Sequence, residues 1–149
     1  MILADFKAFP PIGRVLGIDW GFRRIGVAIS DPTRQFFFVR PVINFKAGAT
    51  NHAQIVAGVA EQESAVAIVV GLPLYSDGTE SDTTKMVKGF VAELEKYTDL
   101  PICLVEENLT SAVAQEEMGR VRIRDLKEKL DSESARVILE NAIAMINRS

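Results

Sequence analysis

The chain has 149 residues, 48% of them hydrophobic and 25% charged, with 17 basic and 20 acidic side chains and a net charge of −3. This composition is typical of a globular protein, and we expect one domain over residues 1–149 with an irregular lead-in over 1–13. No apolar run reaches the roughly 18 residues of a membrane-spanning helix, and the N-terminus does not resemble a signal peptide. We therefore expect a cytoplasmic protein with no membrane partner.

The first predicted elements are strands. The segments 15–21 and 24–31 are joined by a turn that is too short for a parallel crossover, so they are expected to form an antiparallel hairpin. A third strand over 35–45 follows closely enough to extend this meander. Its Pro41 indicates an edge position or a bulge, because proline cannot donate a backbone hydrogen bond to a neighbouring strand.

Helices and strands then alternate. Apolar residues at helical spacing predict helices over 51–63 and 80–97, the second with a capping signal from Thr79 and Asp82. Continuous apolar runs predict buried strands over 64–73 and 100–108. A further helix is expected from Thr110, and a last one over 131–146. This order predicts an α/β fold with a mixed five-stranded sheet, in which an antiparallel meander precedes parallel strands and helices cover both faces.

Three acidic positions differ from the solvated charges. Asp19 lies within a predicted buried strand, where a carboxylate needs a partner or a metal. Glu106 and Glu107 end another buried strand, and Asp131 continues the apolar stripe of the last helix. We expect carboxylates from these three places to converge at one end of the sheet. Converging carboxylates repel each other unless a cation compensates, and hard cations such as Mg²⁺ prefer oxygen ligands.

Each of these acidic residues also has a simpler interpretation. Asp131 is a good candidate for the N-cap of the last helix, and a glutamate at a strand end can be merely solvated. Arg23 or Arg24 could neutralise Asp19 in a structural ion pair. The sequence positions leave these alternatives open.

The other residues with reactive side chains receive no catalytic role. Cys103 lies in an apolar run, which favours a buried and inert thiol. His52, the only histidine, is expected to be a bystander on a polar surface. A Ser-His-Asp triad therefore has no support beyond this one residue.

Basic residues gather in two parts of the chain. The segment 119–129 carries five basic and two acidic residues, and we expect it to be a mobile loop that clamps a nucleic-acid backbone through Arg120, Arg122 and Arg124. The alternation of these arginines with apolar residues also fits a short strand with solvated charges. A second basic group lies near the first strands and consists of Arg23, Arg24, Arg34 and Arg40.

The motifs of the chain resemble those of the YqgF/RuvX family, and the resemblance covers nearly the whole chain after Val15. Four segments occur in the order and spacing of that family: LGIDWGFRRIGVAISDP, IVVGLPLYSDGTES, VEENLTSAVAQEEM and LDSESARVILENAI. The members are described as Holliday junction resolvases and as pre-16S rRNA processing nucleases with an RNase H-like fold. Asn108 stands where the family has an arginine, and Phe22 stands where it has a small hydroxyl residue.

The resemblance implies a set of functional residues. It makes Asp19, Glu107 and Asp131 the catalytic carboxylates and the ligands of Mg²⁺ or Mn²⁺, with two ions expected. Two ions about 4 Å apart would hold the attacking and leaving oxygens of a phosphodiester in line. The expected partner is structured RNA, such as a ribosomal precursor, or branched DNA, and the expected state is a monomer or a homodimer.

The function implied is that of a hydrolase, a metal-dependent endonuclease in the 5′-end processing of pre-16S rRNA during ribosome biogenesis. A Holliday junction resolvase acting on branched DNA is the first alternative, because the backbone chemistry is shared. An ATP-binding module of the same fold is a second. A non-catalytic nucleic-acid-binding protein is a third, since the departures at Phe22 and Asn108 affect positions next to the expected site.

Overall fold

The computed structural model describes residues 2–3, 6–21, 24–44, 51–75, 77–108 and 123–148, with backbone alone for 108, 123–132 and 148. Its strands are β1 (Ile2–Leu3), β2 (Arg14–Trp20), β3 (Arg24–Ser30), β4 (Phe37–Asn44), β5 (Ala65–Leu74) and β6 (Ile102–Asn108). Its helices are α1 (His52–Gln62), α2 (Asp82–Glu95) and α4 (Ile123–Arg148). None of the described helices is long and apolar enough to cross a membrane.

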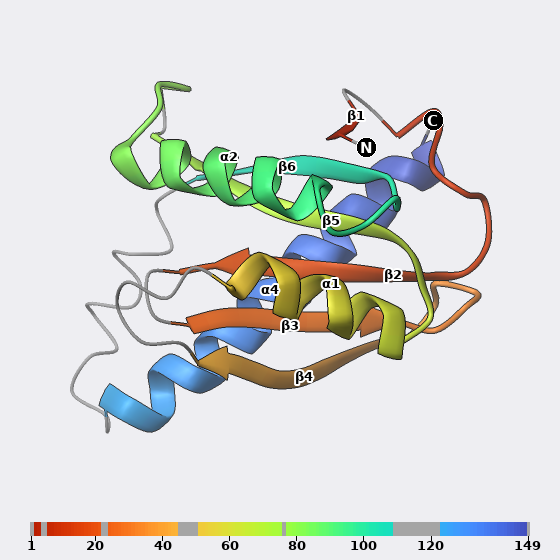
Figure 1. Cartoon of the computed structure of the whole chain (residues 1–149), viewed down its shortest axis with the longest axis horizontal. Helices are drawn as coiled ribbons and strands as arrows, with labels where there is room; N and C mark the ends of the chain where they lie inside the picture. The colour runs from red at the N-terminus through yellow and green to blue at the C-terminus, as the bar shows by residue number, and fades with distance from the viewer. Residues whose placement is uncertain are drawn as a thin grey trace.

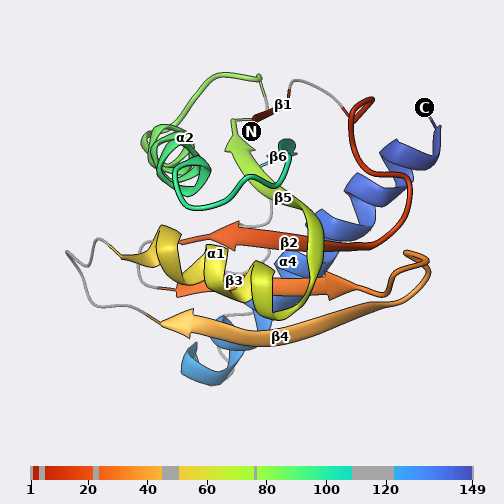
Figure 2. The same cartoon turned by 45° about the vertical axis from the view of Figure 1, so that its right-hand side comes forward.

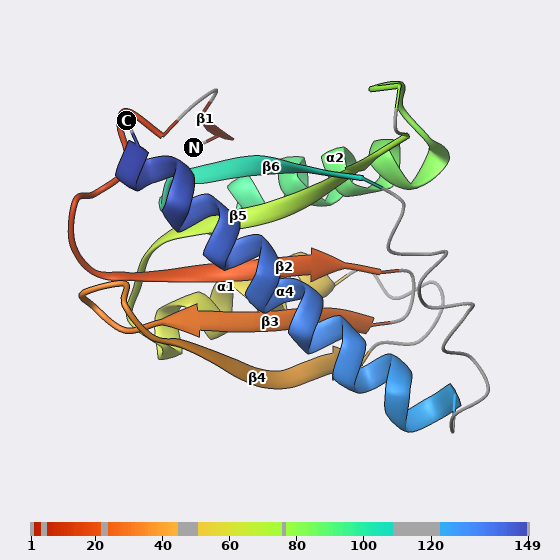
Figure 3. The same ribbon diagram turned by 180° about the vertical axis from the view of Figure 1, so that it is seen from behind.

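The strands form one mixed sheet in the order β1-β6-β5-β2-β3-β4. The pairs β2–β3 and β3–β4 are antiparallel, whereas β2–β5, β5–β6 and β1–β6 are parallel. Helices α1 and α2 cover one face (Figure 1), and α4 crosses the other face diagonally (Figure 3). Figure 2 shows the sheet between these two helical layers. The predicted mixed α/β architecture is confirmed, and Pro41 lies in an edge strand with an irregular register, as expected.

Several predicted boundaries were wrong. The sheet has six strands rather than five, because Ile2–Leu3 in the expected lead-in pairs with β6. Helix α4 begins at Ile123, so Asp131 lies inside the helix and is not its N-cap. Residues 123–129 are accordingly helical rather than a loop, because they contain no glycine or proline and several strong helix formers. The helix predicted from Thr110 lies outside the described residues.

The cap of α2 also differs from the prediction. Ser81 rather than Thr79 is the N-cap: the Thr84 amide donates to Ser81 Oγ at 3.2 Å, and the Ser81 amide donates to Thr84 Oγ1 at 2.9 Å. Thr79 instead closes a turn, with its amide donating to Asp77 Oδ1 at 3.0 Å. The reciprocal bonds of a capping box satisfy two backbone groups, so this pairing defines the helix start.

Alternation along the strands divides the core into two layers. Leu16 and Ile18 of β2 belong to the cluster under α1 and α2, whereas Val15 belongs to the cluster under α4. Glycines allow α4 to lie directly on the strand backbone. A Cβ on Gly17 would be 2.8 Å from Leu139 Cβ and 2.9 Å from the Ala135 carbonyl oxygen. A β-carbon cannot approach other atoms this closely, so the position of α4 depends on this glycine.

We expect Gly17→Ala to lower the free energy of unfolding by about 1–3 kcal/mol, because the added methyl group must displace α4. Gly58→Ala in α1 is the matched control, since a Cβ there meets nothing within 4 Å. It should raise stability by about 0.4–1 kcal/mol through the lower entropy of the unfolded chain. Urea unfolding of both variants tests the difference, and equal effects at the two positions would contradict this account of α4 packing.

Candidate functional site

The candidate site lies on the α4 face of the sheet, where β2 and β6 end. Asp19 is one residue before the end of β2, shares a face with Gly17, and is half-buried. The register pairs Ile18 with Val70 of β5, so Asp19 and Gly71 are the next positions along the two strands. Neighbouring strands lie about 4.8 Å apart, which places Asp19 beside Gly71.

Glu107 reaches the same place from β6. Val105 on β6 belongs to the core under α4, and Glu107, two residues further along, continues that face. Its Oε2 lies 2.8 Å from the Cβ that Gly71 would carry, so its carboxylate occupies the space left by the missing side chain. The neighbouring Glu106 is exposed. The geometry therefore places Glu107 and Asp19 on the two strands that flank β5, on the α4 face and at the same end of the sheet.

Burial changes the pKa of the Glu107 carboxyl group. Loss of solvent raises the pKa of its carboxyl group from 4.5 to about 7, and no other cause contributes among the described residues. A carboxylate held out of water without a compensating positive charge favours protonation or a bound cation. Asp19, by contrast, does take part in an interaction, as does Arg24 at the start of β3.

A divalent cation fits this arrangement. The donors are oxygen atoms on rigid strands, which suit Mg²⁺ or Mn²⁺, and a bound cation would offset the cost of an ionised Glu107. Within the described part of the chain, no group of three or more acidic, histidine or cysteine side chains could hold a metal. The side chain of Asp131, the third expected ligand, lies outside that part.

Asp131 occupies α4 four residues before Ala135, which packs against Gly17. Four residues are about one helical turn, or roughly 6 Å along the axis. Toward its start, α4 runs to the end of the sheet at which β2, β5 and β6 stop (Figure 3). The backbone of Asp131 is thus one turn from Gly17, on the side of the carboxylates.

The arginines of the expected second basic group lie in different surroundings. Arg24 lies on the hairpin at the site end of the sheet, because it follows β2 and begins β3. Arg34 is instead buried and donates to the carbonyl oxygens of Gly13 and Pro10 at 2.9 and 2.6 Å. Arg40 donates to Glu63 at 2.7 Å. Arg34 and Arg40 therefore stabilise the fold, and they no longer belong to the expected group of basic residues that could bind a substrate.

The remaining expected nucleic-acid-binding residues are only partly placed. The structure does not describe Arg23, Arg120 or Arg122, and it gives the backbone but no side chain of Arg124, in the first turn of α4.

Cys103 is buried, as expected. His52, however, is not a surface residue: it is half-buried at the start of α1 and stacks on Phe90, with ring centroids 5.6 Å apart. The expectation of a surface position was wrong because it rested on polar chain neighbours, such as Asn51, which do not reveal contacts with distant residues.

Sequence reasoning also missed Gly71, on which the position of Glu107 depends. A glycine inside an apolar strand is a sign of close approach by another group, and this sign was present in the sequence.

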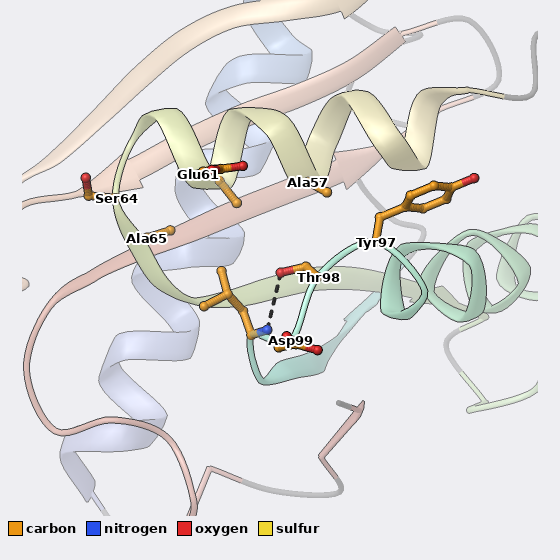
Figure 4. Close-up of a pocket in the computed structure, with 9 residues that line it drawn as sticks. Ala57, Glu61, Ser64, Ala65, Tyr97, Thr98 and Asp99 are labelled. Atoms are coloured by element: carbon orange, nitrogen blue, oxygen red, sulfur yellow. Dashed lines mark hydrogen bonds between the residues drawn. The ribbon is translucent and has the colours of Figure 1, made fainter.

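A pocket of about 360 Å³ lies at the other end of the sheet, between the C-terminal ends of α1 and α2 (Figure 4). Its lining includes Glu61 and Tyr97, whereas the candidate carboxylates take no part in it. Because it lies at the start of β5 rather than at its end, we give it no role in the chemistry.

The raised pKa of Glu107 predicts a pH-dependent stability in the absence of metal. Between pH 4.5 and about 7 the folded protein retains a proton that the unfolded chain loses, so the free energy of unfolding falls as the pH rises. Glu107→Gln should abolish this fall and raise stability at pH 8 by up to about 3 kcal/mol. Urea unfolding in EDTA from pH 4.5 to 8 measures it. Glu106→Gln should keep the wild-type pH dependence; loss of the dependence in that variant would contradict the assignment.

Comparison with known proteins identifies relatives. The model of the RuvX family, described as Holliday junction resolvase, matches residues 13–145. A relative from Maridesulfovibrio salexigens with the name "Putative pre-16S rRNA nuclease" is 41% identical over 133 residues, covering 88% of this chain and 98% of its own. A relative of the same name from Nitratidesulfovibrio vulgaris is 40% identical over 130 residues, covering 86% and 91%.

A solved structure, T. thermophilus RuvC in complex with Holliday junction substrate, is more distant, with a TM-score of 0.47 and 12% identity over 62% of this chain and 64% of that one. The family model spans nearly all of the described sheet together with most of α4. From this match and these relatives, the chain belongs to the RuvX family of nucleases.

Proposed function

We propose that this protein is a divalent-metal-dependent endonuclease that cleaves the precursor of 16S rRNA. The family match and the names of the relatives support the class of reaction, hydrolysis of phosphodiester bonds. The observation that supports the metal dependence is the Glu107 carboxylate, which is half-buried over Gly71, with Asp19 on the strand at the other side of that glycine. Asp131 completes the proposed set of carboxylates.

The chain contributes orientation to this chemistry. Strands β2 and β6 hold Asp19 and Glu107 on either side of β5, and the missing side chain of Gly71 leaves room for a carboxylate between strand and helix. Ile138 of α4 lies against the same glycine and excludes water from that side. A bound divalent cation would supply positive charge that stabilises the negative charge developing on the phosphate.

The names of the relatives favour an RNA substrate, whereas the description of the family model favours a four-way DNA junction as the second candidate. Processing of a ribosomal precursor would place the protein in the cytoplasm. Binding of either polyanion to an acidic protein needs local positive charge, which we assign to Arg23, Arg24, Arg120, Arg122 and Arg124.

The site predicts a contrast between two neighbouring glutamates. Glu107→Gln should lower the cleavage rate of a labelled 16S precursor fragment about a hundredfold or more, because a cation ligand is lost. Glu106→Gln, whose side chain is exposed next to it, should retain the wild-type rate. Gel assays with Mg²⁺, Mn²⁺ or EDTA measure these rates, and a four-way DNA junction run in parallel separates the two substrates. Full activity in EDTA would contradict the metal dependence.

The same assay extends to Asp19→Asn and Asp131→Asn, for which we expect a comparable loss with the fold intact. Circular dichroism provides the control for folding. If Asp19→Asn unfolds the protein, Asp19 is a member of a structural ion pair and not a ligand.

The basic segment predicts a change in salt dependence. Changing Arg120, Arg122 and Arg124 together to Gln should weaken binding to any sequence and reduce the slope of log K against log salt by about one unit per lost phosphate contact. Lys96→Gln, at the far end of α2, provides the control and should leave the slope unchanged. An unaltered slope in the triple variant would remove these arginines from the interface.

A further inference from the structure

Tyr75 is an exposed aromatic residue at the end of the sheet that carries the candidate carboxylates. It directly follows Leu74, the last residue of β5, and 51% of its surface is exposed. In the register between β5 and β6, Pro73 lies opposite Glu107 and Leu74 lies opposite Asn108. Tyr75 is therefore the first residue beyond the paired ends of the two strands, at the same end of the sheet as Glu107.

A hydrogen-bonded turn fixes the backbone around Tyr75. The Tyr75 amide donates to the Thr79 carbonyl at 3.0 Å, and the Gly78 amide donates to the Tyr75 carbonyl at 2.8 Å. Gly78 has φ of 85°, a left-handed conformation that glycine adopts without steric cost. Because the turn is already closed, a ring attached to it loses little conformational freedom when it contacts another molecule.

The position of Tyr75 sets it apart from the other exposed aromatic residues that the structure describes. Phe36 and Phe38 lie by the turn between β3 and β4, which is at the opposite end of the sheet. Tyr97, with 49% of its surface exposed, also lies toward that end and lines the pocket there (Figure 4). Among these rings, Tyr75 is the one at the end of the sheet where β2, β5 and β6 stop, which is the end that carries the candidate carboxylates.

We propose that Tyr75 is a substrate-binding residue on which an unpaired base stacks beside the cleaved phosphodiester. The inference rests on the proposed nuclease function and adds that the substrate is single-stranded at this point. Within a duplex, neighbouring base pairs cover both faces of each base, so a side chain can stack only on a base that is unpaired or at an end. Stacking tolerates any base, which gives a preference for strandedness rather than for sequence.

The first test measures affinity for a fluorescein-labelled single-stranded RNA and for the same strand annealed to its complement. It uses the Glu107→Gln background with Mg²⁺ to prevent cleavage. Tyr75→Ala should weaken single-strand binding about tenfold or more and leave duplex binding unchanged. Tyr75→Phe keeps the ring and should bind within about twofold of the parent, given the dependence on stacking. Tyr97→Ala is the control with matched exposure and should have no effect.

The second test detects stacking directly. A 2-aminopurine base moved along the RNA should be quenched by the parent protein at one position and not by Tyr75→Ala. The slope of log K against log salt should be the same for both, because no phosphate contact is lost. Thermal unfolding of each variant verifies that the exposed turn has kept its fold.

Three results would overturn the inference: single-strand affinity unchanged in Tyr75→Ala, an equal loss in Tyr97→Ala, or a loss in Tyr75→Phe as large as in Tyr75→Ala. Each of these can be seen only if the parent protein binds the RNA. A wild-type protein that neither binds nor cleaves RNA or branched DNA would instead overturn the proposed function, and the two failures are therefore distinguishable.

Discussion

The direct packing of α4 on the backbone of the sheet is the constraint on which the candidate site depends. At Gly17 and Gly71 a Cβ would come within 3 Å of atoms of α4 or of Glu107. These two glycines let the helix lie lower on β2 and β5 than side chains would permit. The low position of α4 closes one side of the Glu107 carboxylate, and the same helix brings Asp131 to the end of the sheet where β2 stops.

This packing disfavours the charged form of the Glu107 carboxylate. A carboxylate that loses water must gain a proton or a positive charge, and for Glu107 burial alone raises the pKa to about 7. Near neutral pH the group is then balanced between its neutral and its charged form. A divalent cation shared with Asp19 would shift this balance to the charged form, so that metal binding and proton release are coupled.

At the opposite end of the sheet, charged side chains form ion pairs. There Glu63, at the C-terminal end of α1, accepts from Arg40 at 2.7 Å and from Arg14 at 3.5 Å, so that the charges are paired across β2 and β4. Arg40 holds the pKa of Glu63 below its ordinary value. Arg14 and Arg40 are thus bound to Glu63 within the fold, at the end of the sheet away from the candidate site.

The sequence by itself determined the order of elements, the mixed sheet and the identity of the unusual acidic residues. These depend on local patterns: alternation assigns Val15 and Ile18 to opposite faces, and a charge such as Asp19 in a buried strand needs an explanation wherever it occurs. The resemblance to the RuvX family was likewise carried by short motifs. The start of α4 was missed because a good N-cap at Asp131 competes with a continuous helix-forming run, and local preference does not decide between them.

The resemblance already named Glu107 over Glu106; the tertiary structure shows how Glu107 is turned inward, how close α4 lies and which arginines are bound within the fold. Glu106 and Glu107 are adjacent and chemically identical, so their roles differ only through the register of β6 against β5. Arg34 and Arg40 are bound by groups distant in the chain. The position of Tyr75 at the same end of the sheet as Glu107 likewise results from the pairing of two strands that α2 separates in the sequence. Such relations arise from long-range contacts, which no local window of sequence contains.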